Sequence, residues 1–348
     1  MAKAVEVNTG TRKYSVTLGS GLNFGKLTLD VKKPCRAMIV SDDNVYPLYG
    51  NLVTESFSKS GFQVSEFIIK NGEASKTLAT VEGLFCHMAE EDMTRGDLII
   101  CLGGGVVGDI GGFASAVYLR GLPFIQIPTT ILAAVDSSVG GKTGVDLSIG
   151  KNLIGAFHQP IAVFCDPDFF TTLPKPVYSD GMAEIIKHGM AFDKEMLISL
   201  DTLSIGEICR RNVEIKARIV EQDEFDTGVR KKLNFGHTIG HAVEAVSDFS
   251  ISHGKAVAIG MTVISRACEK SGLTDEPVLG ELLKALKKYD LPVKCDYSAK
   301  ELTAAALRDK KRSGGTITLV IPRKVGKVGL YDLPVSELEG FIAKGLDR

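Results

Sequence analysis

Residues 98–109 read LIICLGGGVVGD, an apolar run that leads directly into a cluster of glycines. Such an uncharged run is typical of a strand buried on both faces of a parallel sheet. Glycines 103, 105 and 108 satisfy GxGxxG, a turn that lets backbone N–H groups approach a pyrophosphate at a helix N-terminus. The acidic residue expected about twenty positions further on is absent from residues 126–130. Two interpretations stay open, a variant dinucleotide site and a glycine-rich turn without a ligand.

Short apolar segments alternate with helix-length segments on both sides of this stretch. The other predicted strands are 13–18, 37–41, 64–69, 124–127 and 163–165. This alternation predicts a doubly wound, mostly parallel α/β sheet of the nucleotide-binding type.

The pattern changes at Pro174 and Pro176, two prolines that predict a domain boundary. Beyond them, helical periodicity predicts helices at 180–190, 205–224, 238–247, 254–271, 278–289 and 300–311, with one hairpin at 316–321 and 327–331. We therefore expect an N-terminal nucleotide-binding domain at 1–173 and a mainly α-helical domain at 174–348. The active site is expected in the cleft between them.

Bulk composition excludes several classes of protein. The 348 residues carry a formal net charge of −1, so nothing global indicates a nucleic-acid or acidic-membrane partner. The seven cysteines are scattered and form no CxxC, which favours a reducing compartment over a disulfide scaffold. No signal peptide and no run near the roughly 18 apolar residues of a membrane span is found. We expect a cytoplasmic protein.

Three of the six histidines lie between residues 237 and 253. His237 and His241 are four apart, which places them on one face of a helix, and His253 follows after a short polar stretch. Imidazole is a common zinc ligand, so this spacing suits a metal site. The alternative is a helix whose polar residues are satisfied near its start.

A third ligand candidate comes from the predicted helix at 180–190. Glu184 shares a face there with Lys187 and His188, and every other residue of 181–190 is apolar or glycine. The helix is therefore expected to be largely buried, and a buried carboxylate needs a cation or a metal. Glu184 with two of the histidines would leave one coordination position open, as catalytic zinc sites require.

Lysines and arginines in several parts of the chain complete the polar candidates. Residues 140–143 read GGKT, but a P-loop needs glycine where Asp136 stands, so that interpretation fails. The segment 136–146 is expected to be a polar loop, either functional or simply solvated. The cations that could together hold a doubly anionic substrate are Lys142, Lys151, Lys187, Lys216, Arg230 and the run at 310–312.

Taken together, these motifs resemble the 3-dehydroquinate synthase family of sugar phosphate cyclases. The densest stretches are 103–112, 118–121, 128–133, 136–155, 181–189 and 233–244. The resemblance implies conversion of 3-deoxy-D-arabino-heptulosonate 7-phosphate into 3-dehydroquinate and phosphate, with NAD⁺ and a divalent metal, Zn²⁺ or Co²⁺. The implied steps are oxidation at C5, β-elimination of phosphate, re-reduction and aldol closure, with no net redox change.

The same resemblance implies a role for each site residue. Metal ligands are implied at Glu184, His237 and His253, which leaves His241 to the substrate. Catalytic roles are implied for Lys142, Lys187, Asn234 and His241. Substrate contacts are implied for Arg120, Asn152, Lys216, Arg230 and Lys310 or Lys311, with Arg120 reaching the neighbouring subunit of a homodimer. NAD⁺ contacts are implied for Asp42, Glu73, Lys76, Gly104, Gly105, Val106, Asp109, Thr129, Thr130, Leu132, Asp136, Lys151, Asn152, Thr172 and Leu173.

Three other functions remain to be separated from this one. A 2-deoxy-scyllo-inosose or valiolone-type synthase would share the fold, NAD⁺ and the metal ligands but act on a substrate without a carboxylate. Lys216, Arg230, Asn234 and His241 together favour the dehydroquinate enzyme. A metal-dependent polyol dehydrogenase would produce NADH, and an NAD-binding regulator would have no activity.

Overall fold

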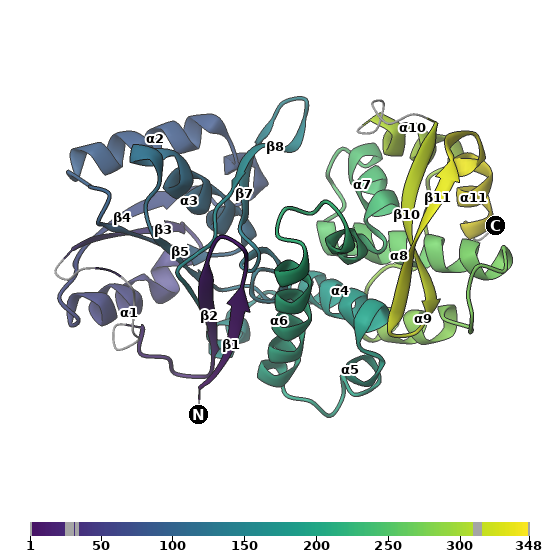
Figure 1. Cartoon of the computed structure of the whole chain (residues 1–348), viewed down its shortest axis with the longest axis horizontal. Helices are drawn as coiled ribbons and strands as arrows, with labels where there is room; N and C mark the ends of the chain where they lie inside the picture. The colour runs from purple at the N-terminus through teal and green to yellow at the C-terminus, as the bar shows by residue number, and fades with distance from the viewer. Residues whose placement is uncertain (1, 25–30, 32–34, 309–314, 347–348) are drawn as a thin grey trace. The chain divides into compact units, whose positions relative to one another are not determined.

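The computed structural model describes residues 2–24, 31, 35–308 and 315–346, and the chain divides into two compact units (Figure 1). The first comprises Met1–Leu173 and Ile205–Phe225, and the second comprises Pro174–Ser204 and Asp226–Arg348. The chain thus leaves the first unit where the sequence predicted a boundary. Residues 205–225, which the prediction assigned to the second domain, belong to the first because helix α6 (Ile205–Gln222) packs on strand β1.

A seven-stranded sheet forms the centre of the first unit, in the order β1-β2-β9-β6-β5-β3-β4. Its strands are β1 (Lys3–Asn8), β2 (Lys13–Leu18), β3 (Arg36–Asp42), β4 (Gln63–Ile69), β5 (Leu98–Gly103), β6 (Phe124–Pro128) and β9 (Ala162–Cys165). Strand β1 runs antiparallel to β2, and the other neighbouring pairs are parallel. The predicted mostly parallel α/β sheet is confirmed, and β1 is an addition that the sequence did not predict.

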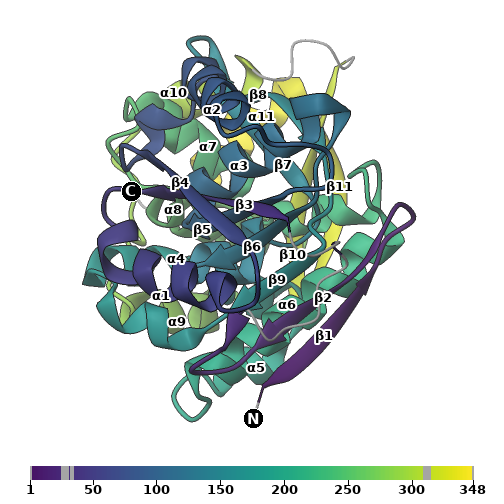
Figure 2. The same ribbon diagram turned by 90° about the vertical axis from the view of Figure 1, so that its left-hand side faces the viewer.

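Helices cover both faces of this sheet, as a doubly wound fold requires. Helix α1 (Tyr46–Ser58) lies on one face, and α2 (Leu78–Glu90) and α3 (Gly105–Val117) lie on the other (Figures 1 and 2). Every residue of β5 is buried, which explains its continuous apolar sequence. A Cβ on Gly108 would lie 2.6 Å from Gln126 Oε1, so this glycine of the GxGxxG pattern lets α3 pack closely on the sheet.

A hairpin of β7 (Lys142–Leu147) and β8 (Gly150–Phe157) occupies most of the segment expected to be a polar loop. That expectation was wrong for residues 142–146, which form a strand. The glycines in this segment hid the alternating pattern of side chains that usually indicates a strand. A Cβ on Gly155 would lie 2.2 Å from the backbone oxygen of Thr143, so only glycine permits this close backbone approach.

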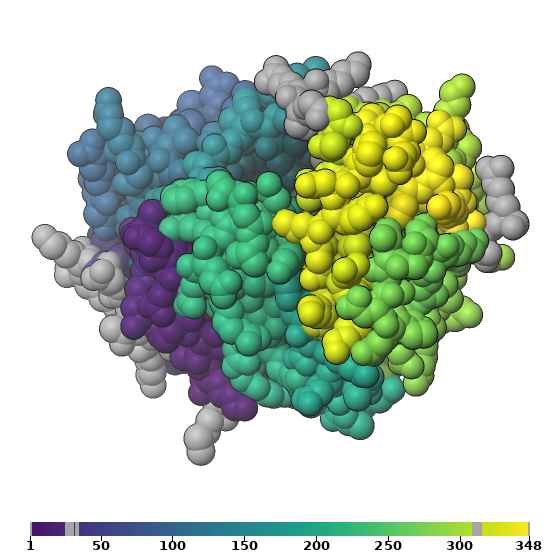
Figure 3. Space-filling view, turned by 45° about the vertical axis from the view of Figure 1, so that its right-hand side comes forward, coloured from purple at the N-terminus to yellow at the C-terminus, as the bar shows by residue number. Residues whose placement is uncertain are grey.

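The second unit is mainly helical with one hairpin, as predicted. Its helices are α4 (Lys175–Phe192), α5 (Lys194–Ile198), α7 (His237–Val246), α8 (His253–Lys270), α9 (Leu279–Lys288), α10 (Ala299–Arg308) and α11 (Leu338–Gly345). Strands β10 (Thr316–Lys324) and β11 (Lys327–Pro334) form the hairpin, which lies at the surface in yellow (Figure 3). Within the described ranges, no helix is both long enough and apolar enough to span a membrane.

Helix α8 is the central element of this unit and packs against α4, α7 and α11. Its contact with α7 is unusually close because both helices carry glycine there. A Cβ on Gly260 would lie 2.1 Å from the backbone oxygen of Gly236, and Gly236 itself has φ +82°. This left-handed residue ends one turn and starts α7 at His237. The two glycines therefore fix where α7 begins relative to α8.

Candidate active site

Three helices of the second unit bring the predicted metal ligands together. Glu184 lies in the middle of α4 and is fully buried, while His237 and His253 are the first residues of α7 and α8. Glu184 Oε1 lies 3.8 Å from His237 Nε2 and 3.4 Å from His253 Nε2. One donor atom from each of the three residues falls within 4.8 Å of the others. A carboxylate and two imidazoles are a donor set that suits a divalent metal such as zinc.

The charges around this group favour a cation. Lys187, one turn after Glu184 on α4, forms an ion pair with it, and both side chains are almost completely buried. Burial lowers the pKa of His237 well below its usual value, and the Lys187 ammonium lowers it further. Burial also lowers the pKa of His253, but its hydrogen bonds to Glu184 and Glu244 outweigh that effect and raise this pKa to about 10. Carboxylates that hold a proton on His253 would equally attract a metal ion.

The remaining predicted residues of this unit lie around the same helix starts. The His241 ring is exposed, and its centroid lies 5.3 Å from that of His237 and 6.1 Å from that of His253. Arg230 is buried and Asn234 is exposed, both in the 3₁₀ turn Val229–Asn234 that precedes α7. The predicted phosphate contacts Lys310 and Lys311 lie outside the described residues. The structure therefore places His241 beside the metal ligands. It does not bring all of the predicted substrate-binding residues together there.

The residues predicted to contact NAD⁺ gather at the carboxyl edge of the sheet in the first unit. They follow the ends of β3 (Asp42), β4 (Glu73 and Lys76), β5 (Gly104, Gly105, Val106 and Asp109), β6 (Thr129, Thr130, Leu132 and Asp136) and β9 (Thr172 and Leu173). Strands β4 and β5 lie on opposite sides of β3, so the strand order reverses there. In open α/β sheets, ligands bind beyond the carboxyl ends at such a point.

A network centred on Lys76 joins this edge to the β7–β8 hairpin. The buried Lys76 Nζ lies 2.6 Å from Asp109 Oδ2 and donates to Asn152 Oδ1 at 2.5 Å. Burial raises the pKa of Asp109 to about 6, although the Lys76 ammonium opposes that rise. Lys151, beside Asn152, pairs with Glu73 at 3.3 Å. Five of the predicted cofactor residues, Glu73, Lys76, Asp109, Lys151 and Asn152, thus lie in one polar cluster.

Sequence reasoning missed Asp146, which supports this cluster. Its Oδ1 accepts the Asn152 backbone N–H at 2.7 Å, and its own N–H donates to the Lys76 backbone oxygen at 2.8 Å. Asn152 has φ +54°, a conformation that asparagine tolerates better than most residues. The only sequence signal was the polar character of the segment, which does not identify a partner.

The structure places three further predicted residues of the first unit in three different environments. Lys216 on α6 is buried and forms an ion pair with Asp136, so a predicted substrate residue contacts a predicted cofactor residue. Lys142 is exposed at the start of β7. Arg120 lies in the turn between α3 and β6, at the amino edge of the sheet, away from the NAD⁺ set. Leu119 and Arg120 have φ of +48° and +69°, so this exposed turn is strained.

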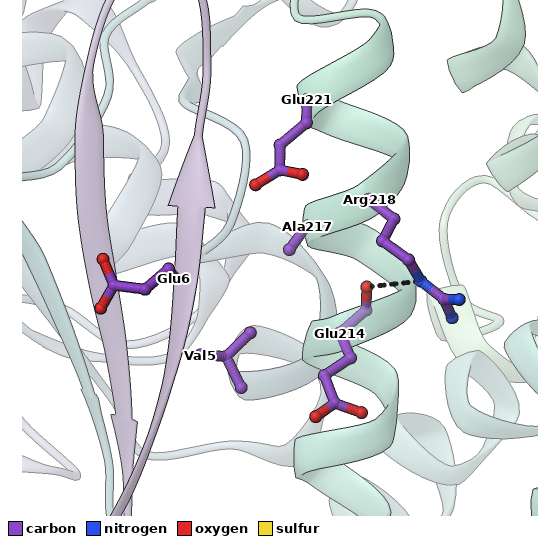
Figure 4. Close-up of a pocket in the computed structure, with 6 residues that line it drawn as sticks. All are labelled: Val5, Glu6, Glu214, Ala217, Arg218 and Glu221. Carbon is purple, nitrogen blue, oxygen red and sulfur yellow. Dashed lines mark hydrogen bonds between the residues drawn. The ribbon is translucent and has the colours of Figure 1, made fainter.

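A surface hollow of about 320 Å³ lies between β1 and α6 (Figure 4). Its lining residues are Val5, Glu6, Glu214, Ala217, Arg218 and Glu221. Arg218 Nε donates to the backbone oxygen of Glu214 at 3.2 Å, so the guanidinium is turned toward its own helix. The residues that line the hollow include none of the predicted site residues.

Comparison with known proteins gives consistent results over the whole chain. The family models for 3-dehydroquinate synthase N-terminal and C-terminal regions match residues 66–180 and 181–312. A 3-dehydroquinate synthase of Streptococcus suis is 42% identical over 349 residues, which cover 97% of this chain and 98% of the relative.

Solved structures of two sugar phosphate cyclases share the fold. The first is 2-deoxy-scyllo-inosose synthase complexed with carbaglucose-6-phosphate, NAD⁺ and Co²⁺, with a TM-score of 0.88, 24% identity, and coverage of 99% of this chain and 100% of that one. The second is 2-epi-5-epi-valiolone synthase from Streptomyces hygroscopicus subsp. jinggangensis with NAD⁺ and Zn²⁺, with a TM-score of 0.86, 26% identity, and coverage of 95% and 96%. Both cyclases are less similar to this chain in sequence, at 24% and 26% identity, than the Streptococcus suis relative at 42%. Because two family models span most of the chain and that relative matches it almost end to end, the chain belongs to the 3-dehydroquinate synthase family.

Proposed function

We propose that this chain is a 3-dehydroquinate synthase, which converts 3-deoxy-D-arabino-heptulosonate 7-phosphate into 3-dehydroquinate and phosphate. The observation that carries the proposal is the group of Glu184, His237 and His253, with Lys187 paired to the carboxylate, in a member of this family. A plain structural role would not require a buried carboxylate beside two imidazoles and an ammonium.

Glu184, His237 and His253 would hold the metal, and the carboxyl edge of the sheet would hold NAD⁺. The two related cyclase structures, with NAD⁺ and Co²⁺ or Zn²⁺, support this choice of cofactors. When bound, the metal would polarise the carbinol oxygen of the substrate, while NAD⁺ would accept a hydride and later return it. The hydride that is taken up would be returned within the cycle, and elimination of phosphate, ring opening and aldol closure are redox-neutral, so substrate and product would differ only by the loss of phosphate.

The side chains of the protein would bind and orient the substrate. Lys187 Nζ lies beside the metal ligands and can hold an anionic oxygen there. The exposed His241 ring, next to His237, can exchange a proton with a substrate hydroxyl. Lys142, Lys151 and Arg230 supply cations for phosphate and carboxylate, with Lys216 and Asn234 as further polar contacts. Fixing the reacting groups in this way lowers the barrier by removing the entropy cost of alignment.

The proposal extends to assembly and location. Arg120 lies at the amino edge of its own sheet, so it would act at the site of a second copy, and we propose a homodimer. We also propose zinc as the native metal and the cytoplasm as the location.

A substrate comparison tests the proposed function. Purified protein with NAD⁺ and Zn²⁺ is expected to release phosphate from heptulosonate 7-phosphate at least about 100-fold faster than from glucose 6-phosphate. The reason is that groups that bind the carboxylate of one substrate gain no such contact from a substrate that lacks it. Phosphate release is followed with a coupled assay, and the product by proton NMR. Equal or faster release from glucose 6-phosphate would instead favour an activity of the 2-deoxy-scyllo-inosose synthase type.

A further inference from the structure

We propose that Glu244 positions the metal ligand His253 by accepting a hydrogen bond from its Nδ1–H, which directs Nε2 toward the metal. This inference rests on the metal site of the proposed function. Glu244 is buried on α7 and its Oε2 lies 3.4 Å from His253 Nδ1. The other nitrogen of the same ring, Nε2, lies 3.4 Å from Glu184 Oε1. The ring therefore bridges two carboxylates through different atoms.

The hydrogen-bonding capacity of imidazole gives the two carboxylates different roles. A neutral ring has one N–H donor and one lone-pair nitrogen, and only the latter can bind a metal. Glu184 belongs to the three-residue group that surrounds the Nε2 side, whereas Glu244 meets the opposite side. A carboxylate beside Nδ1 keeps the proton there and leaves the Nε2 lone pair for the metal. Such outer carboxylates also fix the ring and make it a stronger ligand.

The main chain holds the His237 ring in the corresponding orientation, with Nδ1 at a hydrogen-bond acceptor and Nε2 toward Glu184. Its Nδ1 lies 3.3 Å from the backbone oxygen of Phe235, and its Nε2 faces Glu184. Both histidines thus present Nε2 to the same point. Glu244 stands seven residues after His237, two turns along one face of α7. One helix therefore supplies a ligand and also the residue that orients the ligand from α8.

Glu244 has an alternative role, as a direct metal ligand, which predicts a different number of bound ions. Donor atoms of His241, Glu244 and His253 also lie within 4.8 Å of one another, so Glu244 could be a direct ligand of a second ion. That arrangement would require His253 to bind metals through both nitrogens and lose both ring protons. A positioning role predicts one ion per chain, and a ligand role predicts two.

Metal binding by full-length variants separates these roles. Metal-free wild type, Glu244→Gln and Glu244→Ala are titrated with Zn²⁺ against a competing chelator. We expect one ion in every case, with a dissociation constant about 10- to 100-fold larger for Glu244→Ala. Glu244→Gln keeps an oxygen acceptor and is expected to lose less. Nitrogen NMR of the zinc-loaded wild type should show the His253 proton on Nδ1.

Glu269→Gln is the matched control, because it makes the same chemical change on α8. Glu269 Oε1 accepts the backbone N–H groups of Val278 and Leu279, remote from the metal ligands, so zinc affinity should stay at the wild-type value. Unchanged affinity in both Glu244 variants would overturn the inference, as would two ions in wild type and one in Glu244→Gln. A wild type that binds no zinc would overturn the proposed metal site itself.

Discussion

Glu184→Gln is expected to abolish stoichiometric metal binding and to lower phosphate release more than about 100-fold. Glu184 is the anionic member of the ligand group, and glutamine has nearly the same shape but no charge. Removing an outer partner of a metal ligand already costs about 10- to 100-fold, so loss of a direct ligand should cost more. The measurement is metal content per chain after dialysis, together with the rate of phosphate release.

His241→Ala separates binding of metal from binding of substrate. His241 lies close to His237 and His253, but its exposed ring is outside the group formed with Glu184. We expect this variant to keep one metal ion per chain and to lose activity. Loss of metal from His241→Ala, with retention by Glu184→Gln, would show that the ligand set is wrong.

Lys187→Met is expected to lower the free energy of unfolding of the metal-free protein by about 3–5 kcal/mol. Lys187 and Glu184 form an ion pair with almost no exposure, and methionine removes the ammonium from beside this buried carboxylate. Zinc supplies another positive charge to Glu184, so saturating zinc should recover much of the loss. Urea unfolding with and without zinc measures both values, and Glu184→Gln/Lys187→Met should be more stable than Lys187→Met without metal.

Lys175→Met provides the control on the same helix. Lys175 pairs with Asp290 at 2.6 Å, but the two side chains are 80% and 65% exposed, so removing this solvated pair should leave the free energy of unfolding almost unchanged. Similar unfolding energies for the two lysine variants would contradict the account of Glu184 as a buried charge that needs compensation.

The fold was predictable where burial dominates the sequence. The strands that became β3, β5 and β6 are continuous apolar runs, because helices cover both faces of the sheet. Strands β7 and β8 were missed because glycines replaced the usual branched side chains. Pro174 and Pro176 stand where the chain passes from the first compact unit to the second. They lie at the start of helix α4, which begins at Lys175 and not at the predicted residue 180. Proline is well suited to a first helical turn, where its missing N–H has no partner to lose.

The candidate site was predictable only in part. Helical spacing suggested His237 and His241 as a pair of ligands. The structure instead groups His237 with His253 and with Glu184, which lies 53 positions earlier in the sequence. No local period encodes a contact between three helices. The amphipathic face of α6 likewise gave no sign that its partner is β1, at the start of the chain and in the same compact unit. Family resemblance had named the three ligands, and their ligand role stays a prediction until metal binding is measured.

Turnover with less NAD⁺ than substrate tests the central claim most directly. Protein, zinc and heptulosonate 7-phosphate are combined with about one NAD⁺ for every hundred substrate molecules, and phosphate and NADH are measured together. A cycle that returns its hydride regenerates NAD⁺, so phosphate should approach the full amount of substrate while NADH stays near zero. Formation of NADH that stops after one equivalent of NAD⁺ would identify a net dehydrogenase and contradict the account.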